Sequence, residues 1–212
     1  MTTTIASIIP RVTMVVPGVP YPTAELAIRD SAIEFCRETL FLRAQVDPCD
    51  VTAGEYEYDL SSDVMSARVV RLFDVWLDGS KLAPLSVFDL GRTESDWTSK
   101  TGQPIGYTMI GESKIRLYPI PEAAATLTAY GALAPDRRAT SIDDALVDRW
   151  LDALVFGALS RVLFAPGQQH NDPAAAQAYR YAFKEQIQLA KIEVAVGQTT
   201  KSLTVNPRAF GG

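Results

Sequence analysis

The chain has 212 residues, of which 47% are hydrophobic and 21% are charged, the composition of an ordinary globular protein that is long enough for a sizeable core. Its 20 basic and 25 acidic residues give a net charge of −5, and neither sign forms a long run. This charge pattern argues against a nucleic-acid-binding protein or a polybasic membrane-surface protein, so we expect the partners to be proteins.

No stretch approaches the ~20 uninterrupted apolar residues that a membrane span requires, and no charged leader precedes an apolar segment at the N-terminus. The two cysteines, Cys36 and Cys49, are too few for a disulfide scaffold or a zinc site. We therefore expect a chain that folds in the cytosol with reduced thiols, without membrane contact and without a metal or another cofactor.

Residues 1–22 are predicted to form an extended N-terminal arm. They contain four prolines, which are Pro10, Pro17, Pro20 and Pro22. Proline lacks a backbone N–H and its ring clashes inside a helix, so this spacing disfavours a helix.

From residue 23 the hydrophobic period becomes helical. Leu26, Ile33 and Leu40 recur at every seventh position, with Ala32, Phe35 and Cys36 between them. This pattern predicts an amphipathic helix over about residues 23–44.

After residue 48 the period drops to two, which predicts strands. Residues 55–60 alternate polar with apolar side chains, and residues 68–77 are rich in β-branched and aromatic residues. The dipeptide Asp78-Gly79 follows as a turn, so a hairpin is expected there. Further strand candidates are residues 105–110, 114–118 and 126–130, of which the first two are joined by a tight turn.

Two more helices are expected near the C-terminus, over about residues 141–164 and 172–196. Ser141 is the expected cap of the first helix, and Asp172-Pro173 provides a cap and an N1 proline for the second. The short link between them predicts an antiparallel helical hairpin. Residues 198–212 remain as a C-terminal tail.

These elements predict an α+β fold. Three main helices from opposite ends of the chain, in residues 23–45 and 141–197, form a helical bundle, because their apolar stripes must be buried together. Residues 46–135 form an antiparallel β module inserted into that bundle.

The residues offer little support for catalysis. His170 is the single histidine, in a polar loop, and no nucleophile elbow, P-loop or dinucleotide glycine motif is present. The pairs Asp143-Asp144 and Asp47 with Asp50 could bind a divalent cation, although a helix cap and solvated loops explain them more simply. We therefore predict a protein that is not an enzyme and has no catalytic residues.

Several motifs together resemble the head-to-tail adaptor (connector) proteins of short-tailed bacteriophages. They comprise the helix segment 27–36, the strand pair ending in Asp78-Gly79, the run from Trp97 through Gly102-Gln103-Pro104 and Tyr107 to 115–121, and the hairpin segments 153–159 and 173–183. Each motif alone has low specificity, but their order and spacing cover most of residues 22–194.

The resemblance implies a structural virion protein at the head-tail junction, assembled in the host cytoplasm. Such a protein forms a homo-oligomeric ring of about twelve copies between the portal and the tail nozzle, closed by a heterologous interface. The ring extends the DNA channel, and DNA passes through its lumen without sequence-specific binding. The portal protein and the tail proteins are thus the implied partners, and the β module would face the tail.

The C-terminal tail is the candidate portal-docking segment, because it carries apolar side chains but no predicted fold. The candidate docking residues are Leu203, Val205, Arg208 and Phe210.

Two alternatives remain open on the sequence alone. One is a tail component whose β module binds a host-surface glycan through an aromatic platform that includes Trp97, Tyr107 or Tyr118. The other is a small hydrolase that relies on carboxylates.

Overall fold

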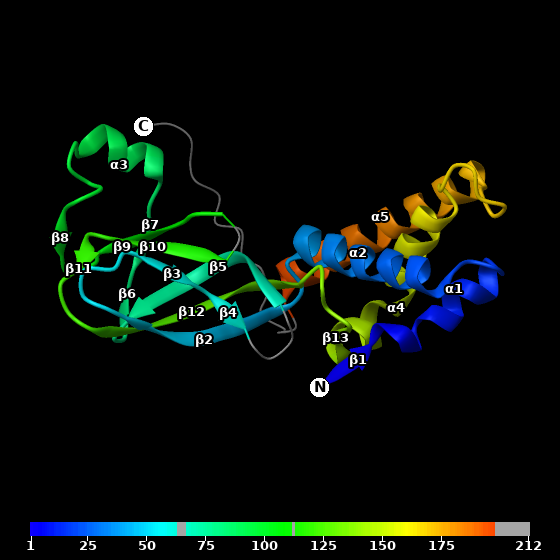
Figure 1. Cartoon of the computed structure of the whole chain (residues 1–212), viewed down its shortest axis with the longest axis horizontal. Helices are drawn as coiled ribbons and strands as arrows, with labels where there is room; N and C mark the ends of the chain where they lie inside the picture. Colours follow the sequence, from blue (N-terminus) through cyan, green and yellow to red (C-terminus); the bar gives the residue numbers. More distant parts are fainter. Residues whose placement is uncertain (63–66, 112, 198–212) are drawn as a thin grey trace, which may run out of the picture.

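The computed structural model describes residues 1–62, 67–111 and 113–197. Figure 1 shows most of the helices gathered at one end of the molecule and most of the strands at the other. Helices α2 (Tyr21–Thr39), α4 (Asp144–Val162) and α5 (Pro173–Val196) form the bundle, and the strands from Arg43 to Pro135 form the β module. The predicted α+β class is confirmed. The division into domains stays a prediction, because one continuous set of buried side chains runs through both ends.

The N-terminal segment is helical where an extended arm was predicted, and that prediction is wrong. After strand β1 (Thr2–Thr4) and the 3-10 turn η1 (Ile5–Ser7), the chain forms helix α1 (Ile9–Val15). Pro10 lies in the first turn of α1, where an N–H has no partner within the helix, so the proline is tolerated. The buried side chains of this segment include Ile5, Ile8, Ile9 and Val12.

Helix α2 buries a different face from the one that its seven-residue period predicts. Leu26 is exposed, and Ile33 and Leu40 are only half-buried. The buried face consists mainly of small residues and is made up of Ala24, Ala27, Ile28, Ser31, Ala32, Phe35, Cys36 and Thr39. The helix ends at Thr39, earlier than predicted, and Leu40 follows in the left-handed conformation at φ 53°.

The helices of the C-terminal hairpin begin at aspartate caps. Asp172 accepts hydrogen bonds from the backbone N–H groups of Ala174 and Ala175 at 3.1 and 3.0 Å, as expected for the cap of α5. Asp143, rather than the predicted Ser141, caps α4 through the N–H of Ala145 at 2.7 Å. Ser141 belongs to strand β13 (Ser141–Asp143), which pairs with β1.

The larger sheet of the β module has five antiparallel strands. Its order is β2 (Arg43–Val51), β12 (Ala125–Pro135), β5 (Ala67–Leu77) and β4 (Ser61–Ser62), with β6 (Ser80–Lys81) also paired to β5. The hairpin predicted at Asp78-Gly79 is confirmed, because both residues adopt positive φ values, 47° and 79°, between β5 and β6.

Strand β2 was not predicted, because Pro48 lies within it. Opposite Pro48 the register with β12 shifts between Leu127 and Ala129, so two residues of β2 face one residue of β12. Because the bulge lies on a strand at the edge of the sheet, it accommodates the proline while the pairing of β2 with β12 continues on both sides.

The second sheet has the order β3 (Glu57–Asp59), β10 (Lys114–Tyr118), β9 (Gly106–Met109) and β7 (Ala83–Pro84). The β9–β10 hairpin confirms the predicted pair of strands, whereas β7 runs parallel to β9. A short parallel pair of strands, β8 (Thr101–Gly102) and β11 (Ile120–Pro121), and an unpredicted helix α3 (Val87–Thr93) complete the module. Figure 1 shows α3 at the end of the module that points away from the bundle.

Candidate functional site

Three helices meet at Gly157 in the middle of α4. A Cβ atom at this position would lie 2.8 Å from the Cβ of Ser31 on α2 and 3.1 Å from Cε2 of Phe183 on α5. Both neighbouring side chains are buried, so only glycine lets the three helices approach this closely. The three helices are therefore closely packed at this point, where a larger residue would force them apart.

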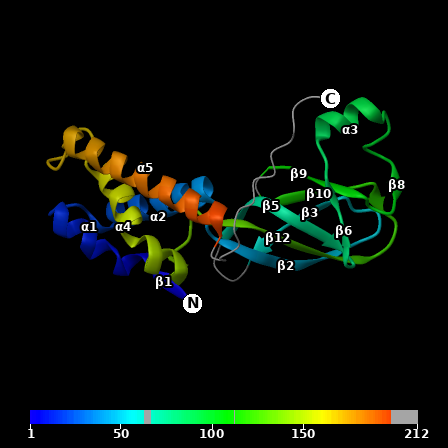
Figure 2. The same cartoon turned by 180° about the vertical axis from the view of Figure 1, so that it is seen from behind.

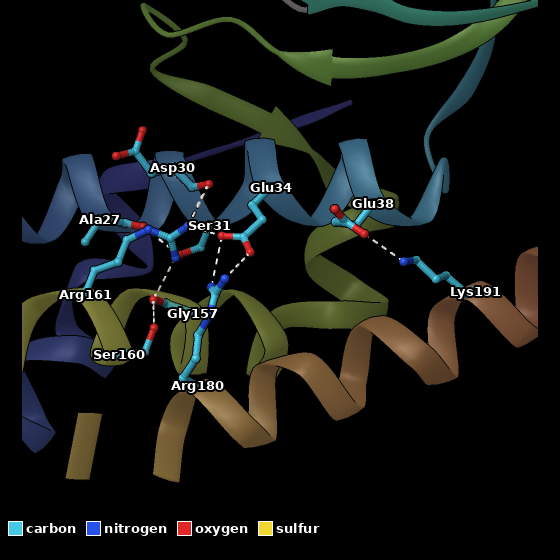
Figure 3. A network of polar contacts seen from close by, with 10 residues as sticks. All are labelled: Ala27, Asp30, Ser31, Glu34, Glu38, Gly157, Ser160, Arg161, Arg180 and Lys191. Atoms are coloured by element: carbon cyan, nitrogen blue, oxygen red, sulfur yellow. Dashed lines mark hydrogen bonds and ion pairs between the residues drawn. The ribbon is translucent and has the colours of Figure 1, made fainter. Parts of the chain in front are cut away.

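A network of charged side chains lies beside this contact, as Figure 3 shows. Glu34 of α2 receives a bidentate pair of hydrogen bonds from Arg180 of α5, at 3.0 and 2.6 Å. Arg161 of α4 also donates to Glu34, and through its other amino group it donates to Ser31 Oγ and the Gly157 carbonyl, both at 2.9 Å. One carboxylate thus connects two arginines from two other helices.

The charge state of Glu34 follows from this geometry. Partial burial alone would raise the pKa of its carboxyl, but the hydrogen bond from Arg180 and the positive charge of Arg161 outweigh that effect and hold the pKa below its ordinary value. The same hydrogen bond raises the pKa of Arg180. Glu34 and Arg180 are therefore charged at neutral pH, and the geometry of the network is that of a structural contact.

A cavity with a volume of about 670 Å³ opens next to this network. Phe164, Pro173 and Ala176 form its apolar wall, and Arg161 and Arg180 line its polar side. The Phe164 ring is 68% exposed, so the cavity is an open groove on the surface of the bundle.

Helix α5 carries exposed apolar side chains along its outer face. We define the α5 stripe as Tyr181, Glu185, Leu189, Ile192 and Val196. The four apolar members are between 49% and 63% exposed. Their spacing of three, four or eight residues places them on one face of the helix, opposite the buried Phe183, Ile187 and Ala190.

A second exposed apolar surface lies on α1. We define the α1 face as Arg11, Met14 and Val15, which the spacing of three and four residues places on one side of the helix. Met14 is 77% and Val15 47% exposed. Figures 1 and 2 place α1 and α5 on opposite sides of the bundle, with α4 between them.

The β module has its own exposed features at the end far from the bundle. Val87 and Phe88 of α3 and the neighbouring Ile105 are exposed. Arg116 stacks between two aromatic rings, 4.4 Å from the ring centre of Tyr56 and 4.5 Å from that of Trp97. This stack occupies the rings with a side chain of the protein itself.

The aromatic platform proposed for glycan binding is not formed. Tyr107 and Tyr118 are buried, at 5% and 3% exposure, and the Tyr118 hydroxyl donates to Glu94. Trp97 is only half-buried, but its ring is covered in part by Arg116. A platform for a sugar needs open ring faces that these residues do not offer.

The remaining candidates from the sequence fall into two groups. The candidate portal-docking residues Leu203, Val205, Arg208 and Phe210 lie outside the described residues. Asp143 is occupied as a helix cap, and in the part of the chain that the structure describes no three His, Cys, Asp or Glu residues gather into a group that could hold a metal ion. Burial raises the pKa of the Cys36 thiol to about 12, so this thiol stays protonated.

The Glu34 network and the α5 stripe were not found from the sequence. Glu34 is separated from Arg161 and Arg180 by more than a hundred residues, and a single sequence carries no signal that pairs them. The stripe could have been found from the sequence. Tyr181, Leu189, Ile192 and Val196 are apolar residues of this helix that lie outside the face predicted to be buried.

None of the helices within residues 1–62, 67–111 and 113–197 combines the length and the hydrophobicity needed to span a membrane. Comparison with known proteins gives one family: the model of the SU10 adaptor protein family matches residues 3–207, which is nearly the whole chain. No curated protein matches the chain significantly.

Proposed function

The chain belongs to the SU10 adaptor protein family, and from this membership we propose that it forms a ring between the portal and the tail nozzle of a bacteriophage particle. The predicted resemblance to phage head-to-tail adaptors is confirmed at the level of the family. A phage adaptor is a structural component of the virion, so a non-enzymatic role follows. The ring, its place at the head-tail junction and its assembly in the host cytoplasm are our proposal.

The observation that carries the proposal is the placement of exposed apolar side chains on three separate surfaces. The α1 face and the α5 stripe lie on opposite sides of the bundle, and Val87 and Phe88 lie at the far end of the β module. Apolar surface that is kept outside a well-packed core is typical of protein-protein contacts. A ring subunit needs two lateral contacts and at least one axial contact.

We infer that the β module provides the contact to the tail. It projects from the bundle at the end opposite to α1, and α3 at its tip exposes Val87 and Phe88 beside Arg92, which stacks over the Phe88 ring at 5.8 Å. A mixed aromatic and arginine surface is a common composition for interface centres.

The portal contact is assigned to the C-terminal tail. Helix α5 ends at Val196, near the junction of the bundle with the β module, and residues 198–212 follow it in the sequence. Leu203, Val205, Arg208 and Phe210 combine apolar anchors with a cation, a pattern that suits a segment ordered by a partner.

The net charge of −5 fits a lumen through which DNA slides. A surface without basic patches gains little free energy from releasing the counterions of DNA, so it does not retain the duplex. We propose that the ring has about twelve copies. We also propose that DNA passes through it without sequence-specific binding.

The test is sedimentation of the full chain with purified portal particles, followed by mass measurement of the complex. We expect the portal to gain a whole number of copies, about twelve, in a closed ring visible by negative-stain imaging. Deletion of residues 202–212 should abolish this binding, while deletion of residues 211–212 alone, which keeps the four docking residues, should preserve it. A chain that stays monomeric with portal present contradicts the proposed function.

A further inference from the structure

The α5 stripe is an apolar surface that the bundle itself leaves uncovered. The buried side of α5 already packs against α4 and α2 through Ala176, Phe183, Ile187 and Ala190. The stripe points away from these residues and runs for about four turns, from Tyr181 to Val196. A stripe of this length is suited to another helix lying along it.

The α1 face lies on the other side of the bundle. Helix α1 packs on α2 and α4 through Ile9 and Val12, which leaves Arg11, Met14 and Val15 outside. The two surfaces differ in shape and composition. A contact between them joins unlike faces of two copies, and contacts of this type repeat around an axis and form a ring when the rotation closes.

Charges on the two surfaces are complementary. Glu185 lies in the middle of the α5 stripe and has no ion-pair partner in the described part of the chain, whereas Glu193 on the same helix is paired with Arg149. Arg11 likewise has none there, and the first acidic residue in the sequence is Glu25, so the N-terminal segment is purely cationic. Opposite charges in facing positions fix the register of an interface and exclude wrong partners.

We propose that the α5 stripe of one copy packs against the α1 face of the next copy, with Glu185 facing Arg11. This inference rests on the proposed ring and names the surfaces that close it. The occupant of both surfaces is therefore a second copy of this chain.

Cysteine crosslinking on the assembled complex tests the pairing directly. In a Cys49→Ser background, which keeps only the fully buried Cys36, the variants Met14→Cys and Ile192→Cys are prepared separately, mixed with portal particles and oxidised. We expect crosslinked dimers only when both variants are present, and a ladder of higher species when one chain carries both cysteines. As the control, one chain carries Phe88→Cys, at a similar exposure on α3, together with Ile192→Cys, and it should give no ladder.

Charge exchange tests the same contact without cysteines. Glu185→Arg and Arg11→Glu each place like charges in facing positions, and each should weaken association between copies by about tenfold or more, while the double exchange restores it. Both side chains are exposed, so the thermal unfolding of the isolated variants should match that of the parent chain.

The outcomes separate this inference from the proposed function. If copies assemble on the portal but crosslink as Met14→Cys pairs or Ile192→Cys pairs, the interface is isologous and the inference is overturned while the adaptor role stands. A crosslink from Ile192→Cys to the portal instead of to a second copy overturns it as well. If no copies assemble on the portal, the proposed function and this inference fall together.

Discussion

In the helical half three helices meet around one glycine, whereas in the β module most strands are held by backbone pairing to a neighbour. The contacts in the bundle join residues from distant parts of the chain, such as Ser31, Gly157 and Phe183. Those of the β module include hairpins closed by short turns, such as β5–β6 and β9–β10. The bundle is therefore sensitive to side-chain volume, and the module to turn chemistry and register.

Removing a buried ring from the bundle should have the largest effect. Phe183→Ala deletes a side chain that is fully buried and packs near Phe35 at 6.5 Å between ring centres, so we expect a loss of about 3–5 kcal/mol in the free energy of unfolding. The matched control in the β module is Phe88→Ala, whose ring is 72% exposed and whose loss should stay within about 0.5 kcal/mol. Urea unfolding followed by circular dichroism measures both, and equal losses would contradict the packing described.

Adding one methyl group should have the next largest effect. Gly157→Ala places a Cβ 2.8 Å from Ser31, so α2 or α5 must shift, and we expect a loss of about 1–3 kcal/mol despite the better helix propensity of alanine. Gly91→Ala in α3 of the β module meets only Trp97 Nε1, at 3.8 Å, and should be neutral or slightly stabilising. Thermal unfolding of the two variants decides the point; a neutral Gly157→Ala would show that the helices separate easily there.

Breaking the charged network should cost less and should depend on pH. Glu34→Gln removes the carboxylate that binds Arg161 and Arg180, with an expected loss of about 1.5 kcal/mol at pH 7. In the folded protein the pKa of Glu34 lies below its ordinary value of 4.5, so its contribution is complete above that pH and disappears as the pH falls through the lowered pKa.

The comparison for this prediction is Glu94→Gln in the β module. Glu94 also has a lowered pKa, held down by hydrogen bonds from Lys100 and Tyr118, but its contact with Lys100 is exposed to solvent and screened. We expect a smaller loss for Glu94→Gln than for Glu34→Gln when unfolding is measured from pH 7 to pH 3. If the difference between the parent chain and Glu34→Gln stays constant down to pH 3, the network does not stabilise the bundle electrostatically.

The β strands with clear turns were the most predictable part of the fold. The Asp78-Gly79 turn and the caps of α5 follow from local chemistry that needs no distant partner. Strand β2 was missed because Pro48 is accommodated by a bulge, which depends on β12 some eighty residues later.

The buried face of α2 shows why the hydrophobic period alone predicted the wrong face. Hydrophobic periodicity favours large side chains such as Leu26, yet the helix packs through Ala24, Ala27 and Ser31, because α4 approaches closely at Gly157. Small residues contribute little to the hydrophobic periodicity of a helix, so periodicity does not reveal a close contact between helices. The Glu34 network has the same origin, since its partners are set by the bundle and not by neighbours in the chain.

The placement of the β module between α2 and α4 also determines the order in which the protein can fold during synthesis. Roughly a hundred residues separate the end of α2 from the start of α4, so at about 5–20 residues per second α2 waits some 5–20 s for the first helix of the C-terminal hairpin. Strands β2 to β12 are synthesised during that interval, while α4 and α5 are still missing from the face of α2 that they later cover. The ribosome thus delivers the β module before the bundle can close, and the α5 stripe, which we propose as a contact between copies, is synthesised only after that module.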